Sequence, residues 1–296
     1  MEFVKSKLAW IKSHKKESWL IVLMVFVIVG AELGIKFRPP LPQAPRVPVK
    51  PLKITSSTNS NSEFTIYKSP KLAKAKKYNI YLIGDSMTHA FGPRGGIFSE
   101  LINKAYPGTF FEVSNYAHAN ESILLLPDNL KTPVQADKDL LLKPILEGNP
   151  DLIIIESFGY NPLSQFGLKG GIEKQNEYLT EIMTTLTNRF PNTAIMFFTA
   201  IAPDKKTYGM NITHATEAER WAQAEERIDY ITNHRDYAIE HRIPLIDAYQ
   251  ASLDSDGDGD TKYINPDDNI HPSEEGLALM ARVMVKTIQE DKIFPK

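Results

Sequence analysis

The sequence predicts an α/β fold: a three-layer α/β/α domain with a five-stranded, mainly parallel sheet, preceded by an N-terminal transmembrane helix. From residue 78 to the C-terminus, apolar strand-like runs alternate with amphipathic stretches, which is the order of repeated β–α units. The runs Leu152–Ile155 and Ile195–Phe198 are continuously apolar, as is typical of parallel strands covered on both faces. An uncharged segment between N-terminal lysines and a proline-rich stretch indicates the transmembrane helix.

The expected elements of the domain follow from these runs in chain order. The first strand begins at Tyr78, is rich in β-forming residues, and breaks at Gly84 into small polar residues that favour turns and helix N-caps. Further strands are expected at Phe110–Tyr116, Asp151–Phe158, Thr193–Ile201 and Ile243–Tyr249. Helices are expected in the amphipathic stretches Ile97–Tyr106, Lys138–Leu146, Gly171–Phe190, Thr213–His241 and Ser273–Ile293.

The composition excludes several kinds of chemistry. The 296 residues suffice for one sizeable catalytic domain with appendages, and they include no cysteine. Disulfides, thiolate metal sites and a cysteine nucleophile are therefore excluded. Residues 1–77 contain 15 lysines and arginines against 4 acidic residues, whereas residues 78–296 contain 19 against 32. A domain this acidic is a poor candidate for binding nucleic acid, which requires a basic surface.

The N-terminal region has the pattern of a membrane anchor. Residues 1–18 hold 5 lysines and form the expected cytoplasmic tail. Residues 19–35 form the expected transmembrane signal-anchor, a run of 17 residues that is uncharged except for Glu32. This length is at the short end for a membrane-spanning helix. The positive-inside rule keeps the lysines in the cytoplasm and places the domain on the other side of the cell membrane.

Two alternatives to this anchor stay open, and both concern the same apolar run. Val29-Gly30-Ala31 resembles the small-residue cleavage site of a secretory signal peptide, and a buried core helix is the second alternative. Residues 36–77 are expected to form a stalk, first rich in proline and then in serine, threonine and asparagine. Residues 78–296 are expected to form the catalytic domain.

Ser86 is the candidate nucleophile. It follows the first strand within Gly84-Asp85-Ser86, where the strand ends. Open α/β sheets bind their ligands at the carboxyl ends of parallel strands. A serine hydroxyl at this place is therefore well positioned to meet a substrate.

Asp268 and His271 are the candidate acid and base. Both lie in the loop Asp268-Asn-Ile-His271-Pro-Ser, immediately before the expected C-terminal helix. A spacing of three residues lets the carboxylate reach the imidazole and hold the tautomer that accepts a serine proton.

These two motifs resemble the first and last blocks of the SGNH (GDSL-type) hydrolases, and the resemblance extends from Tyr78 to the C-terminus. The resemblance implies ester hydrolysis by a Ser86–His271–Asp268 triad, with neither metal nor cofactor. Two alternatives remain. One is O-acyl transfer with the same triad, and the other is a non-catalytic binding module that keeps the fold.

The family's two middle blocks imply the oxyanion hole, the group of donors that stabilises negative charge on the substrate oxygen. Gly159-Tyr160-Asn161 resembles the third block, although Pro162 replaces the acidic residue that usually follows. Asn120 stands where the second block has a glycine that donates its backbone N–H. Asparagine tolerates positive φ, so this donor can persist. The expected donors are the Ser86 N–H, the Asn120 N–H and the Asn161 amide.

One acidic loop is a weak candidate for calcium. Asp254, Asp256, Asp258 and Asp260 match the start of an EF-hand loop, but Asn265 replaces the glutamate expected at its twelfth position. An acidic turn with little or no affinity for calcium is the leading interpretation. The expected partners of the protein are the membrane and a small-molecule or polysaccharide ester.

Overall fold

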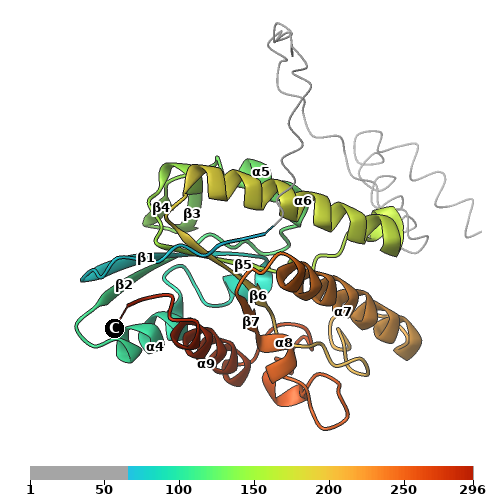
Figure 1. Ribbon diagram of the computed structural model, residues 1–296. Coiled ribbons are helices and arrows are strands. Elements are labelled where there is room, and N and C mark those ends of the chain that lie inside the picture. The colour runs from blue at the N-terminus through green and yellow to red at the C-terminus, as the bar shows by residue number, and fades with distance from the viewer. Residues whose placement is uncertain (1–65, 296) are drawn as a thin grey trace, which may run out of the picture. The chain divides into compact units, whose positions relative to one another are not determined.

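The computed structural model describes residues 66–295 (Figure 1). The expected cytoplasmic tail, the transmembrane segment and residues 36–65 of the expected stalk lie outside the described residues. Within residues 66–295, none of the helices has both the length and the apolar character needed to cross a membrane.

Within the described residues, five parallel strands form the central sheet in the order β2-β1-β5-β6-β7. The strands are β1 Lys77–Ile83, β2 Phe110–Asn115, β5 Leu152–Glu156, β6 Ala194–Thr199 and β7 Leu245–Asp247. Parallel strands require crossover connections, and helices provide most of them here. The predicted three-layer α/β fold with a five-stranded parallel sheet is confirmed.

The helices cover both faces of this sheet (Figure 1). Helix α4 packs beside α9 on one side, and α6 lies on the other side with α7 beside it. The long helices are α4 Gly96–Ala105, α6 Gly167–Arg189, α7 Glu217–Glu240 and α9 Glu274–Glu290. The short helices are α3 Ser86–His89, α5 Leu126–Asn129 and α8 Ala248–Ala251, and the 3-10 turns are η1 Ile123–Leu125, η2 Ile145–Glu147, η3 Ser164–Phe166 and η4 Thr261–Tyr263.

Strand β5 shows why the central strands are apolar at every position. Leu152 and Ile154 belong to the hydrophobic cluster on the face of α4 and α9, whereas Ile153 and Ile155 belong to the cluster on the face of α6. All four side chains are at most 1% exposed. Because successive side chains of a strand point to opposite faces, a sheet buried on both faces requires an apolar residue at each position.

The expected helix at Lys138–Leu146 is wrong. The structure has an antiparallel hairpin there, with β3 Val134–Asp137 and β4 Leu140–Leu142, followed by η2. The Asp137 side chain accepts the N–H of Lys138 at 2.7 Å and so stabilises the turn between the two strands. Pro144 then removes a backbone donor, which prevents a helix from continuing through this segment.

Two helix starts also differ from the expected bounds, for reasons of capping. Helix α7 begins at Glu217 instead of Thr213, because Thr216 and Glu219 form a capping box there. Helix α6 begins at Gly167, four residues before the expected Gly171, in continuation of η3.

The chain just before β1 is attached to the domain through Tyr67. Its backbone N–H donates to the carbonyl oxygen of His241 at 2.8 Å. Its hydroxyl accepts the N–H of Ile195 at 2.7 Å, and the side chain is 7% exposed. The last residues of the expected stalk are therefore part of the packed structure.

The buried imidazole of His234 is expected to make the stability of this domain depend on pH. Its ring is fully buried on α7 and stacks on Phe197 with a centroid distance of 4.2 Å. Burial lowers the pKa of His234 to about 3, against the opposing effect of the Ile155 backbone. The unfolded chain takes up this proton near pH 6.5, whereas the folded domain does not until about pH 3. Acidification therefore favours the unfolded state throughout this interval.

We expect His234→Phe to reduce this pH dependence. Between pH 6.5 and 5, the wild type should lose about 2 kcal/mol more of its free energy of unfolding than the variant, at roughly 1.4 kcal/mol per pH unit. Urea unfolding at the two pH values measures the difference, and His214→Phe, at an exposed position, is the control. Equal losses in the wild type and His234→Phe would contradict a neutral buried imidazole.

Candidate active site

The turn after β1 places Ser86 at the carboxyl edge of the sheet. Gly84 ends the strand where it lies against β5, and a Cβ there would lie 2.6 Å from Thr88 Oγ1 and 2.7 Å from Glu156 Cβ. Real Cβ atoms do not approach so closely, so the turn requires glycine. Asp85 then caps helix α3 by accepting the N–H of Met87 at 2.9 Å. Ser86 is consequently the first residue of a helix, where backbone N–H groups lack intrahelical partners.

The structure brings Ser86, His271 and Asp268 together, although 185 residues separate the first two. His271 Nε2 lies 3.0 Å from Ser86 Oγ, and His271 Nδ1 lies 2.7 Å from Asp268 Oδ2. The other Asp268 oxygen accepts the backbone N–H groups of Ile270 at 2.8 Å and His271 at 3.0 Å. The His271 side chain is 39% exposed and is therefore accessible to a substrate.

Asp268 carries a stable negative charge beside this imidazole. Partial burial acts to raise the pKa of Asp268, but the hydrogen bonds from the His271 side chain and from the backbone N–H groups of His271 and Ile270 together outweigh it. The pKa of Asp268 is therefore lowered. A fixed carboxylate on Nδ1 leaves Nε2 as the proton acceptor that faces Ser86.

A second pair of carboxyl groups, Asp85 and Glu156, is fully buried beside the nucleophile. Asp85 Oδ2 accepts the side-chain amide of Asn161 at 3.0 Å. Glu156 accepts the backbone N–H of Asp85 at 3.2 Å and the hydroxyl of Ser157 at 2.5 Å. Burial raises the pKa of Asp85, and burial together with the charge of Asp85 raises the pKa of Glu156 well above its usual range. Burial and the neighbouring Asp85 thus favour the protonated form of Glu156.

Glu156 did not stand out in the sequence, although the sequence holds one signal of its role. It is the last residue of the otherwise apolar strand Leu152–Glu156. A carboxyl group at the carboxyl end of a central parallel strand is costly to bury and lies where active sites form. Its contact with Asp85 depends on the pairing of β1 with β5, which the sequence does not state.

The other two expected site residues, Asn120 and Asn161, line one pocket of about 320 Å³. Asn120 adopts φ 59°, a left-handed backbone conformation that asparagine tolerates better than most residues. One N–H of the Asn161 amide donates to Asp85, and the second donates no hydrogen bond within residues 66–295. The amide is thus oriented by Asp85 and keeps one donor for a ligand.

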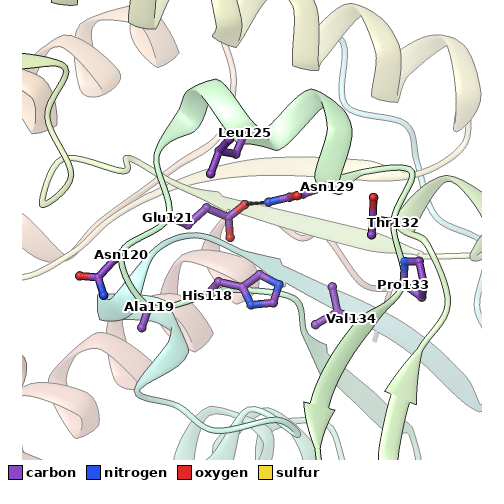
Figure 2. A pocket seen from close by; sticks show the side chains of 9 residues that line it. All are labelled: His118, Ala119, Asn120, Glu121, Leu125, Asn129, Thr132, Pro133 and Val134. Carbon is purple, nitrogen blue, oxygen red and sulfur yellow. Dashed lines mark hydrogen bonds between the residues drawn. The ribbon is translucent and has the colours of Figure 1, made fainter. Parts of the chain in front are cut away.

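A second pocket, of about 360 Å³, also has Asn120 in its lining and lies between the loop after β2 and the β3 hairpin (Figure 2). Glu121 contributes a carboxyl group to its wall, where it accepts a hydrogen bond from the Asn129 amide. Burial, opposed by Asn129 and assisted by the charge of Asp85, raises the pKa of Glu121 to about 7. His118, on the same wall, has a pKa lowered by burial and by His89.

The aspartates of the acidic loop at 254–260 make hydrogen bonds to nearby backbone groups. Within residues 66–295, no three histidine, aspartate or glutamate side chains converge as ligands for an ion. Asp254 instead accepts the backbone N–H groups of Asp256 at 2.9 Å and Asp258 at 3.0 Å, and so stabilises a turn. Asp258 accepts the backbone N–H of Lys205, and Asp260 caps η4.

The fold resembles those of solved bacterial lipases. A lipase/acylhydrolase from Enterococcus faecalis matches 74% of this chain and 98% of its own, at 19% identity and a TM-score of 0.50. Two proteins described as GDSL-like lipases also match. The one from Parabacteroides merdae has 16% identity and a TM-score of 0.55, covering 76% of this chain and 100% of its own. The one from Bacteroides thetaiotaomicron has 12% identity and a TM-score of 0.51, covering 74% and 93%.

The family follows from a match along most of the domain. A comparison with curated proteins finds no match. Residues 82–279 match the model of the GDSL-like lipase/acylhydrolase family, and this range contains Ser86, Asp268 and His271. The chain belongs to the GDSL-like lipase/acylhydrolase family, and it is a hydrolase that acts on ester bonds.

Proposed function

We propose that this protein is a serine esterase in which Ser86 is the nucleophile, His271 the general base and Asp268 the residue that orients the base. The observation that carries the proposal is the continuous chain of hydrogen bonds from Asp268 Oδ2 through the imidazole to Ser86 Oγ. A nucleophile within hydrogen-bond distance of a base, itself oriented by a third group, is the arrangement of covalent acyl transfer.

In the first half of the reaction, Ser86 Oγ attacks the ester carbonyl carbon while its proton passes to His271 Nε2. Asp268 stabilises the imidazolium that forms. The negative charge that develops on the carbonyl oxygen is held by the Ser86 N–H, the Asn120 N–H and the free N–H of the Asn161 amide. Cleavage of the ester bond releases the alcohol, which receives the proton from His271. Water, deprotonated by His271, then attacks the carbonyl carbon of the acyl-enzyme. The bond from Ser86 Oγ to the acyl group breaks, His271 returns the proton to Oγ, and the carboxylic acid leaves.

Labelling with a fluorophosphonate probe tests this assignment directly, because such probes phosphonylate activated serines. The expected result is one adduct, located on Ser86 by mass spectrometry. Neither Ser86→Ala nor His271→Ala should be labelled, whereas Ser99→Ala on helix α4 should be labelled as the wild type is. Labelling of Ser86→Ala at another serine would refute the assignment.

We further propose that the esterase is tethered to the cell membrane, with its catalytic domain extracytoplasmic and its substrate a small-molecule or polysaccharide ester. The support is the run at 19–35, uncharged except for Glu32, between a lysine-rich tail and a proline-rich stalk. Glu32 lies near the end of this run, where a carboxylate reaches the interface at little cost.

The tether predicts how the protein fractionates. The full chain should sediment with membranes and resist carbonate extraction. Proteolysis between Arg38 and Glu63 should release a soluble, active domain, because the cut precedes the buried Tyr67. Immunoblotting and an esterase assay of both fractions measure the result. A soluble extracytoplasmic protein whose N-terminus lies near Glu32 would show a cleaved signal peptide instead.

A further inference from the structure

The pocket that contains Asn120 and Asn161 also contains a single charged side chain, Arg227. This arginine lies on α7 and reaches the pocket from a different element than the loops that carry the two asparagines. The neutral polar side chains that line the pocket are Asn120, Ser122, Tyr160, Asn161, Ser164 and Gln165.

The guanidinium of Arg227 is held firmly on one side only. Its Nε donates to the Tyr208 hydroxyl at 2.9 Å, and its carbon lies 5.3 Å from the centre of the Tyr208 ring. Its Nη1 donates to the Gln223 carbonyl oxygen at 3.0 Å and to Glu226 at 3.1 Å. Its Nη2 donates no hydrogen bond within the part of the chain that the structure describes.

We propose that Arg227 forms an anion-binding subsite of the esterase, so that the preferred substrates carry a carboxylate or phosphate group near the scissile ester. This inference rests on the proposed function, because the ester is placed by the proposed oxyanion donors Asn120 and Asn161. Both of these residues line the same pocket as Arg227.

The chemistry of the guanidinium selects this class of group. The guanidinium stays charged at every physiological pH, and its Nη2 has two N–H groups that can donate to a carboxylate or phosphate. Because Tyr208, Gln223 and Glu226 already fix its orientation, little side-chain entropy is lost when a ligand reaches Nη2. Glu226 offsets part of the charge, but it is not among the residues that line the pocket.

The charge of the surrounding protein limits the kind of anion that fits. Residues 78–296 contain 32 acidic side chains against 19 basic ones, so the domain as a whole repels anions at long range. The subsite therefore acts by direct contact within the pocket, and a group bearing one or two charges fits it better than a densely charged polymer.

Three acetate esters of similar size test the subsite: 4-acetoxybenzoate, 4-acetoxyphenyl phosphate and the neutral methyl 4-acetoxybenzoate. Arg227→Gln should lower kcat/KM for the carboxylate or the phosphate ester at least tenfold more than for the neutral ester. The ester with the larger selective loss identifies the preferred anion. Arg227→Lys, which keeps the charge but loses the fixed Nη2 donors, should give an intermediate loss. Arg282→Gln, an equal charge change on the exposed face of α9, should leave the anionic-to-neutral ratio unchanged.

Equal losses on all three esters, or no loss on either anionic ester, would overturn the inference. Inhibition of the wild-type protein gives a test that does not depend on how a variant folds. Benzoate or phenyl phosphate should compete with the substrate, whereas benzamide should not, and equal inhibition by all three would also overturn it.

Binding to Ser86→Ala separates this inference from the proposed function. Calorimetry should show that adding Arg227→Gln raises the Kd of an anionic ester at least tenfold more than that of the neutral ester. If the wild type hydrolyses none of the esters, the proposed function fails, and the binding measurement alone shows whether Arg227 binds the anionic group. If the wild type hydrolyses all three with no preference that depends on Arg227, the subsite fails and the esterase stands.

Discussion

Replacing Ser86 with alanine is expected to lower kcat/KM for ester hydrolysis by roughly 10⁴–10⁶-fold, the loss typical of triads that act as a unit. The hydroxyl that this change removes is the group that His271 Nε2 contacts at 3.0 Å. Without it no acyl-enzyme forms, and only the oxyanion donors and the bound geometry remain to assist water. Initial rates with p-nitrophenyl acetate, measured for the wild type and the variant at equal concentration, give the ratio.

The companion variants make this prediction specific to a triad. His271→Ala should cost about as much as Ser86→Ala, and the double variant should cost little more than either. Asp268→Asn should cost less, because the imidazole remains in place. Ser99→Ala is the matched control and should retain wild-type rates. Near-normal hydrolysis by Ser86→Ala would show that another residue attacks the ester.

The second large effect is expected at Asn161, whose replacement by alanine should lower kcat by about 10²–10³-fold, as is typical for the loss of one oxyanion donor. Asp85 holds the Asn161 amide at 3.0 Å, so the free N–H has a fixed direction before the substrate arrives. The hydrogen bond from this N–H becomes stronger as negative charge develops on the substrate oxygen. Its removal therefore lowers kcat and has a smaller effect on KM. Steady-state kinetics on p-nitrophenyl acetate separates the two constants.

Asn79→Ala is a matched control for this prediction. Its amide also donates to one oxygen, that of Asn149 at 3.1 Å, but it lies near the amino end of β1, away from the site. It should retain wild-type kcat. Thermal unfolding of Asn161→Ala then shows whether the loss of the contact with Asp85 also destabilises the domain. Full activity in a folded Asn161→Ala variant would show that another group is the oxyanion donor.

Local residue patterns were sufficient to predict most of the fold. The continuous apolar runs at 152–155 and 195–198 correctly predicted buried parallel strands, since both faces of the sheet are covered. Gly84, Asp85 and Ser86 correctly indicated a turn into a capped helix, because these residues act through contacts with near neighbours in the chain. The Asp268 and His271 pair also lies as its spacing of three predicted.

Features that depend on pairing between distant segments could not be predicted in this way. The contact of Glu156 with Asp85 exists because β1 and β5 are neighbours in the sheet. The helix expected at 138–146 is wrong because it covers strand β4, where three consecutive leucines carry no alternating pattern that would distinguish a strand. Arg227 belongs to no motif in the sequence, and only the packing of α7 brings it to the pocket.

The close approach of Gly84 to Glu156 and Thr88 constrains how this site can diverge. A methyl group at position 84 would overlap atoms of both neighbours, so no larger residue fits there while they keep their present side chains. The atom of Glu156 that such a methyl group would meet is Cβ, which every residue except glycine carries, so a shorter side chain at position 156 does not make room for it. Position 84 is therefore expected to remain glycine in homologous chains that keep a side chain at position 156, although 72 residues separate the two positions.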